Sequence, residues 1–109
     1  MKKLTILLFS ILISFNSYGG TSDKTVCVET DAQIRMCEYE NGQIESKGKV
    51  KDGKKDGKWT WWYENGQIKS EEHYKDGRRD GKWTHWHKNG RIEIERNYKD
   101  GKCISGDCL

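Results

Sequence analysis

The chain has 109 residues, of which 34% are charged, 33% hydrophobic and 11% aromatic, with a formal net charge of +3 at pH 7. Basic and acidic residues are interleaved and form no basic stripe, which argues against a nucleic-acid partner. A domain this small and this poor in apolar residues buries a modest fraction of its surface, so extra cross-links are expected.

A secretory signal peptide is predicted at residues 1–19. Residues 1–3 supply a basic start, residues 4–15 an apolar stretch, and small residues then lead to a cleavage site near Gly19 or Gly20. The apolar stretch is shorter than the ~20 residues that a membrane-spanning helix requires, so no transmembrane segment is expected in the mature chain. An uncleaved anchor is the alternative. The mature protein is therefore expected in the periplasm or outside the cell.

A 24-residue repeat follows a short N-terminal segment, residues 20–32, and fills residues 33–102. Asn-Gly begins each copy of a tetrapeptide at residues 41–44, 65–68 and 89–92, and Asp-Gly recurs at residues 52–53, 76–77 and 100–101. Both dipeptides favour type I′ hairpin turns, and the residues between them alternate as in strands. We predict an all-β fold: an elongated array of antiparallel β-hairpins in one twisted meander sheet of about six or seven strands.

Two-residue turns at every Asn-Gly and Asp-Gly determine which residues share a face of this sheet. One face is predicted to be apolar and to carry Tyr39, Ile44, Val50, Trp59, Trp61, Tyr63, Ile68, Tyr74, Trp83, Ile92, Ile94 and Tyr98. The other is predicted to carry Thr60, Lys69, Glu71, His73, Thr84, Glu93 and Glu95, together with Trp62 and Trp86. A bulge after the Asp-Gly turns, within residues 54–57 and 78–81, would shift this pattern by one residue beyond it.

The cysteines flank the repeats, with Cys27 and Cys37 before the first full copy and Cys103 and Cys108 in the C-terminal cap, residues 103–109. An even number in an exported protein indicates disulfides. The first and last strands of a meander lie on the order of 29 Å apart, whereas bridged Cα atoms lie within ~7 Å. We therefore predict the local pairs 27–37 and 103–108. A four-cysteine zinc site is the alternative, although these spacings are looser than usual.

The pattern resembles the MORN repeat in its short bacterial variant. Residues 57–66 read Gly-Lys-Trp-Thr-Trp-Trp-Tyr-Glu-Asn-Gly, and an Ile, a Tyr and a second turn Gly follow at positions 68, 74 and 77. Residues 81–101 repeat the match with His87 in the tyrosine position. The resemblance implies an elongated hairpin array that contacts proteins or lipids and catalyses no reaction. Bacterial proteins of this kind are often described as antitoxin-like, of the YwqK type.

Trp62 and Trp86 occupy equivalent positions of two repeats, on a face otherwise made of polar residues. Tryptophan is enriched in binding hot spots and stacks on sugars, so these residues, with Lys69 and His73, are the predicted binding residues. The alternative is that a curled sheet or residues 20–32 cover this face and that both rings are packed.

No catalytic residue, metal site or cofactor is predicted. His85 and His87 could begin a metal site on one strand face, but no third ligand is evident and both replace aromatic residues of the preceding repeat. We expect a non-catalytic exported module that binds another protein, with an antitoxin or immunity-like neutraliser as one form. Binding of an envelope glycan or a lipid is the alternative.

Overall fold

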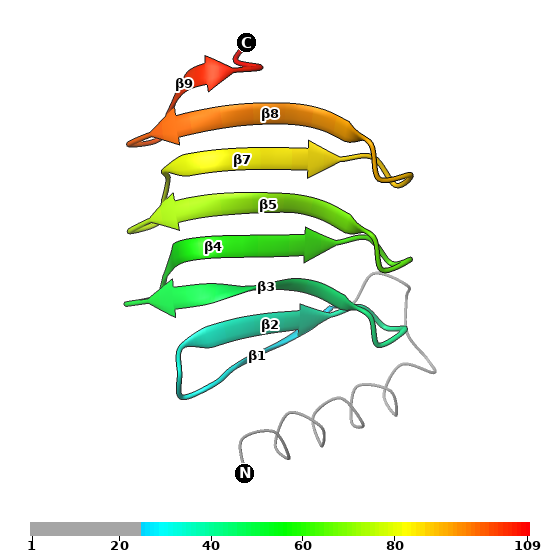
Figure 1. Ribbon diagram of the computed structural model, residues 1–109. Helices are drawn as coiled ribbons and strands as arrows, with labels where there is room; N and C mark the ends of the chain where they lie inside the picture. Colours follow the sequence, from blue (N-terminus) through cyan, green and yellow to red (C-terminus); the bar gives the residue numbers. More distant parts are fainter. Residues whose placement is uncertain (1–24) are drawn as a thin grey trace.

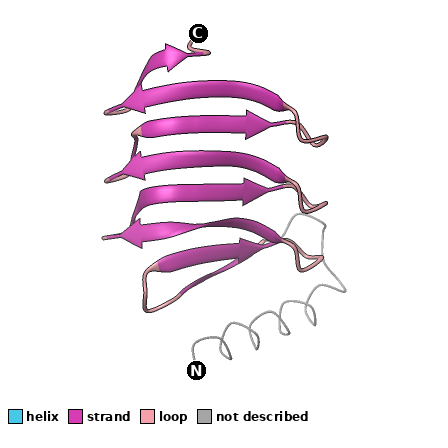
Figure 2. Cartoon of the chain, in the orientation of Figure 1, coloured by secondary structure: helices cyan, strands magenta, loops and turns pink. Residues whose placement is uncertain are grey.

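The computed structural model describes residues 25–109 (Figure 1), so the predicted signal peptide lies outside the described residues. These residues form one open, nine-stranded antiparallel sheet whose strands follow each other in chain order, with the short β6 pairing only with β5. The strands are β1 (Val26–Glu29), β2 (Ile34–Glu38), β3 (Ile44–Lys51), β4 (Lys54–Trp62), β5 (Ile68–Lys75), β6 (Arg78–Arg79), β7 (Gly81–Trp86), β8 (Ile92–Lys99) and β9 (Lys102–Gly106). Figure 2 shows only strands and loops in this part of the chain. The predicted all-β meander is confirmed, and it extends further at both ends than residues 33–102.

The Asp-Gly turns have the predicted type I′ geometry. Asp52, Asp76 and Asp100 have φ values of 51°, 50° and 49°, and the glycines that follow have values of 77°, 83° and 85°. Positive φ at both central residues matches the right-handed twist of the flanking strands, and Asp and Gly tolerate it better than other residues. These turns therefore connect β3 to β4, β5 to β6 and β8 to β9 tightly.

The Asn-Gly turns differ from the prediction. At residues 63–67 only Gly66 has positive φ, at 91°, while the Gly66 amide donates to the Tyr63 carbonyl (2.9 Å) and the Tyr63 amide to the Gln67 carbonyl (2.8 Å). This is a three-residue loop, a type I turn closed by a glycine bulge. The Asn65 side chain accepts a hydrogen bond from the Gln67 amide at 3.0 Å, which stabilises the turn. The first and third Asn-Gly hairpins have the same hydrogen bonds.

The longer loop changes which residues share a face. The register shifts next to each Asn-Gly hairpin, so Trp62 lies opposite Ile68 and Trp86 lies opposite Ile92. Directly opposed residues of an antiparallel pair share a face. Ile68 and Ile92 therefore lie with Trp62 and Trp86, and their predicted place on the apolar face is wrong.

A bulge follows the Asp-Gly turns at residues 52–53 and 76–77, and it contains two extra residues where a bulge of one was considered. Val50 lies opposite Lys55, whereas Gly48, two residues earlier, lies opposite Trp59, four residues later. Two extra residues leave the alternation of faces unchanged. Trp59 therefore stays on the predicted apolar face, and β5 and β7 have the same shift before Trp83.

The hydrophobic core lies on one side of the sheet, which we call the core face, and its buried members are Cys37, Val50, Trp59, Trp83 and Tyr98. Trp59 lies flat on the backbone of Gly48, where an added Cβ would be 2.1 Å from the ring. Long basic side chains cover the aromatic rings: the Lys55 ammonium is 5.0–5.1 Å from the rings of Trp59, Trp61 and Tyr74. Arg79, one repeat later, lies in the same way 4.5 Å from the Trp83 ring. Cation–π contacts and lysine or arginine stems thus take the place of a second layer.

Candidate functional site

Trp62 and Trp86 lie on the opposite side of the sheet, which we call the outer face. Trp61 belongs to the core face, where its indole N–H donates to Glu72 at 3.0 Å, and successive residues of a strand point to opposite faces. Both outer tryptophans are half-buried. Their backbone carbonyls accept hydrogen bonds from the Tyr39 and Tyr63 hydroxyls, at 2.8 and 2.7 Å, each from the preceding repeat. Neighbouring repeats are thereby held at a constant spacing.

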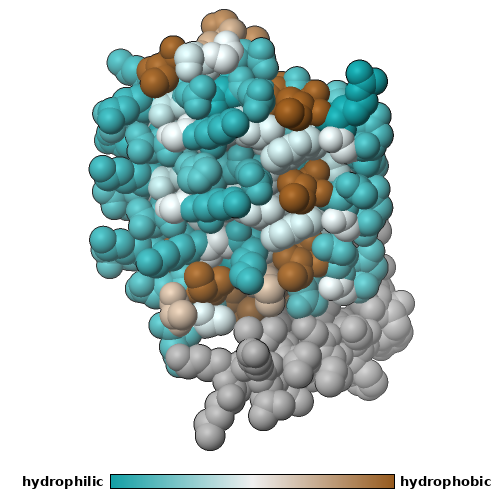
Figure 3. Space-filling model, in the orientation of Figure 1, coloured by the Kyte–Doolittle hydropathy of each residue, from teal (hydrophilic) through white to brown (hydrophobic). Residues whose placement is uncertain are grey.

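Isoleucines extend these rings into an apolar strip. Ile68, 38% exposed, lies opposite Trp62, and Ile92, 55% exposed, lies opposite Trp86. We call these four residues the Trp–Ile strip. Figure 3 shows a column of hydrophobic side chains near the Asn-Gly ends of the strands, beside a surface that is otherwise hydrophilic. The strip thus crosses β4, β5, β7 and β8.

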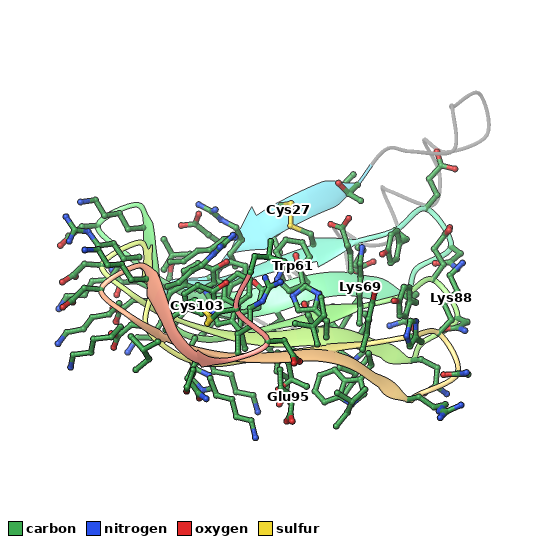
Figure 4. All side chains as sticks on the ribbon, turned by 90° about the horizontal axis from the view of Figure 1, so that it is seen from above. Cys27, Trp61, Lys69, Lys88, Glu95 and Cys103 are labelled. Atoms are coloured by element: carbon green, nitrogen blue, oxygen red, sulfur yellow. A yellow bond between two sulfur atoms is a disulfide. The ribbon has the colours of Figure 1, made fainter. Side chains whose placement is uncertain are left out.

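Charged side chains border the strip on the same face. The Lys58 ammonium is 3.2 Å from a Glu71 carboxylate oxygen, and the equivalent pair of the next repeat, Lys82 and Glu95, is 3.5 Å apart. Figure 4 shows Glu95 on the side of the sheet opposite to Trp61. Such exposed pairs contribute little to stability. They give the strip a polar rim of mixed charge.

The predicted binding residues do not all lie together. His73 is on the outer face, but its Nδ1 is 2.9 Å from the Lys82 carbonyl and takes part in a hydrogen bond within the sheet. Lys69 lies on the same side of the sheet as Trp61 (Figure 4), with its ammonium 5.7 Å from the Tyr63 ring. The register shift beside the Asn-Gly loop separates Lys69 from Trp62 and Trp86. Ile68 and Ile92, which replace it, were detectable only by allowing a three-residue loop at Asn-Gly.

A polar cluster lies within the core face around the buried side chain of Glu72. Its carboxylate accepts hydrogen bonds from the Trp61 indole (3.0 Å), the Tyr74 hydroxyl (2.9 Å) and the Ser70 hydroxyl (3.1 Å), and the His85 Nε2 is 3.9 Å away. Burial raises the pKa of Tyr74, and the hydrogen bond to Glu72 and the charge of Glu72 raise it further. The carboxylate is fully engaged by its neighbours, so this cluster stabilises the fold.

The two histidines of the His-x-His sequence lie beside separate carboxylates. His85 is near Glu72, and the Nδ1 of His87 is 4.0 Å from Glu93. Within residues 25–109, no group of three His, Cys, Asp or Glu side chains is arranged to hold a metal ion. The ring of His85 stacks on Trp83 at 5.9 Å, which is the packing expected for a residue in an aromatic position.

The cysteines are joined in the predicted pairs. Cys27 lies opposite Cys37 in the register of β1 and β2, with Cα atoms 4.0 Å apart, and Cys103 is bonded to Cys108 across a short loop. Two disulfides are compatible with a periplasmic or extracellular location. Residues 25–109 contain no helix that is long and apolar enough to span a membrane.

Two segments of the repeat region are similar to a known family. Residues 55–76 and residues 79–100 each match the family model of the MORN repeat variant. No curated protein and no solved structure matches the chain. The first matched segment contains Trp62 and Ile68, and the second contains Trp86 and Ile92. All four residues of the Trp–Ile strip therefore lie in the two segments that match the MORN repeat variant.

Proposed function

We propose that this chain is a non-catalytic, exported repeat module that binds another protein through the Trp–Ile strip. The observation that carries the proposal is the repeated pair of a half-buried tryptophan and an exposed isoleucine on the sheet face opposite to the hydrophobic core. Tryptophan is among the residues most enriched in binding hot spots, and a contiguous exposed apolar feature with a polar rim is typical of protein-binding surfaces.

The shape of the strip favours a macromolecular partner. Trp62 and Trp86 are separated by two strands, or ~10 Å at the usual strand spacing, and both lie on an open sheet. A small molecule is usually held in a concave pocket that buries most of its surface. A protein segment can instead cover both rings at once, with the Lys58–Glu71 and Lys82–Glu95 pairs at the rim of the contact.

An antitoxin or immunity-like neutraliser is one form of this proposal, and it is supported by the resemblance to antitoxin-like repeat proteins. If the chain is exported, its target is a toxin that acts outside the cytoplasm. Binding of an envelope glycan is the alternative, because tryptophan rings also stack on sugars. Lipid binding has less support. Removal of the predicted signal peptide with its two lysines leaves a nearly neutral chain, which has little attraction for an anionic membrane.

The test compares partner binding by three matched variants of the mature chain. A protein retained by the wild type from an envelope extract is identified, purified and titrated against each variant. We expect Trp62→Ala with Trp86→Ala to weaken binding by about 2 kcal/mol or more and to change stability little. The control replaces Lys58 and Lys82 by Ala, which changes two repeat-equivalent residues of the same face, and should retain most of the affinity.

Replacing the buried tryptophans of the core face provides a comparison in which stability is expected to fall. Trp59→Ala with Trp83→Ala should lower the free energy of unfolding by about 3–5 kcal/mol for each well-buried ring. The proposal is wrong if the Trp62 and Trp86 variant unfolds as readily as this core variant, because both faces would then be structural. Retention of envelope polysaccharide in place of protein would establish the glycan alternative.

A further inference from the structure

The third Asn-Gly hairpin differs chemically from the first two. Residues 39–44 and 63–68 both read Tyr-Glu-Asn-Gly-Gln-Ile, whereas residues 87–92 read His-Lys-Asn-Gly-Arg-Ile. The backbone is the same in all three, with φ values of 87°, 91° and 90° at the glycines and equivalent hydrogen bonds. Three of six positions have therefore become basic while the hairpin geometry is unchanged. The Tyr, Glu and Gln of the first two hairpins are replaced by His, Lys and Arg, so the single carboxylate of the segment is lost.

The changed residues line a hollow at the Asn-Gly ends of the strands. It has a volume of about 670 Å³ and is lined by Tyr63, His87, Lys88, Asn89, Arg91 and Ile92. No carboxylate side chain is part of this lining. Lys88 and Arg91 are exposed, and within residues 25–109 neither has an ion pair, although His87 is 4.0 Å from Glu93. Two cations that have no ion pair among the described residues thus face a hollow with an aromatic and an aliphatic wall, and the Lys88 ammonium lies 5.8 Å from the Tyr63 ring.

The neighbouring hollow, on the other side of Tyr63, shows that this charge is local. It has a volume of about 390 Å³ and is lined by Tyr39, Tyr63, Glu64, Asn65, Lys69 and Lys88. Here Glu64 occupies the position that Lys88 has one repeat later. Glu64 partly neutralises this second hollow, so the hollow beside the third hairpin favours an anion more strongly.

The hollow is also connected to the Trp–Ile strip. Ile92 lines the hollow and lies opposite Trp86 in the strip, so one side chain belongs to both. Figure 4 shows Lys88 on the same side of the sheet as Lys69. A partner segment that covers Trp86 and Ile92 and continues around the Asn-Gly ends of the strands would therefore reach Arg91 and Lys88. Charge complementarity then requires acidic groups on that part of the partner.

We infer that the hollow beside the third hairpin binds the carboxylates of a short acidic segment of the protein partner, adjacent to the apolar residues that cover the Trp–Ile strip. Arg91 presents a planar fork that can hold a carboxylate through two hydrogen bonds, and Lys88 adds a second charge-assisted contact. The inference rests on the proposed function, because it assumes that the partner is a protein.

The probe is a fluorescein-labelled synthetic peptide of two leucines followed by four glutamates, and its control has glutamines in place of the glutamates. The variant His87→Tyr, Lys88→Glu, Arg91→Gln gives the third hairpin the sequence of the other two, so it should fold. The control Lys75→Glu, Arg78→Gln removes the same charge at the Asp-Gly ends of the strands, where both side chains are exposed. Fluorescence anisotropy measures the dissociation constants.

We expect the glutamate peptide to bind the wild type, with an affinity that falls as salt is added, and the hairpin variant to bind at least about tenfold more weakly. The charge-matched control should change binding by no more than about threefold. Amide shifts at residues 87–91 in a nuclear magnetic resonance titration would locate the contact. An equal loss in both variants, or equal binding of the glutamine peptide, would overturn the inference.

Two further measurements separate this inference from the proposed function. Binding to vesicles that contain phosphatidylglycerol, without binding to the glutamate peptide, would contradict the inference and indicate a lipid headgroup. Peptide binding that is lost in the hairpin variant supports the acidic-segment site even if Trp62→Ala with Trp86→Ala leaves partner binding unchanged. In that case the strip fails as the main contact while the basic hollow remains.

Discussion

At the scale of single residues, the core face combines buried charge with aromatic rings. Glu72 is 7% exposed and lies among Trp61, Ser70, Tyr74 and His85, and each of the first three donates a hydrogen bond to its carboxylate. Leaving a buried carboxylate without donors would be costly, whereas three donors offset much of its desolvation. The cluster is therefore a place where removing one hydroxyl has a measurable effect.

The first prediction concerns the response of this cluster to alkaline pH. Burial and Glu72 raise the pKa of Tyr74 above its usual value of 10.0, so the folded state favours the neutral phenol. The stability that this preference contributes is complete below about pH 10 and is lost as the pH rises through the pKa of the folded state. Urea unfolding of the wild type should therefore show a larger loss of stability between about pH 9 and pH 11 than unfolding of Tyr74→Phe.

The comparison isolates Tyr74, because Tyr39, whose pKa is raised mainly by burial and then by Glu45 and Glu64, is present in both proteins. At neutral pH, Tyr74→Phe should cost about 1 kcal/mol through the lost hydrogen bond to Glu72. Parallel losses of stability in the two proteins above pH 9 would contradict the assignment.

At the scale of the elements, the two kinds of glycine turn explain what could be predicted from the sequence. Asp-Gly and Asn-Gly carry nearly the same local signal, and the sequence pattern located all six turns. The Asn-Gly hairpins, however, also contact each other: Asn41 donates to the Glu64 carbonyl at 3.3 Å, and the Tyr hydroxyls bond to the next repeat. These contacts between repeats are absent from the dipeptide signal, which is why the two-residue loop was wrong.

The wrong loop length at Asn-Gly changed the predicted face of only some residues. Trp59, Val50 and Trp83 lie near the Asp-Gly ends or mid-strand, and their core positions are as predicted. Ile68 and Lys69 lie within three residues of Gly66, and both are on the other face from the predicted one because the loop contains one residue more. Residues next to a turn are therefore the least predictable, and half of the Trp–Ile strip consists of such residues.

The second prediction tests the basic side chains that cover the core face. Lys55→Ala should lower the free energy of unfolding by about 1–2 kcal/mol, because the ammonium lies over three rings and its stem covers them. The neighbouring Lys54 is exposed, and Lys54→Ala should change stability by less than about 0.5 kcal/mol. Arg79→Ala and Arg78→Ala are the equivalent pair in the next repeat. Thermal and urea unfolding measure both pairs, and equal effects of Lys54→Ala and Lys55→Ala would rule out the covering role.

At the scale of the whole molecule, the sheet is held together by contacts between consecutive strands. Hydrogen bonds between repeats run from the Gly77 amide to the Lys55 carbonyl at 2.9 Å and from the Gly101 amide to the Arg79 carbonyl at 2.8 Å. Repeat proteins of this kind have a stability that is close to a sum of repeat and nearest-neighbour terms. The terminal strands have one neighbour in the strand order, so they are the places where cross-links have most effect.

The last prediction follows from this arrangement. Cys27 and Cys37 join β1 directly to β2, so Cys27→Ala with Cys37→Ala should remove about 2–3 kcal/mol of stabilisation from this end of the sheet. Because contacts are local, the loss should appear as faster hydrogen exchange at the amides of β1 and β2, while those of β4, β5 and β7 keep their protection. Cys103→Ala with Cys108→Ala should act in the same way on β8 and β9. Uniformly faster exchange across all strands in either variant would show that the sheet unfolds as one cooperative unit, against the nearest-neighbour description.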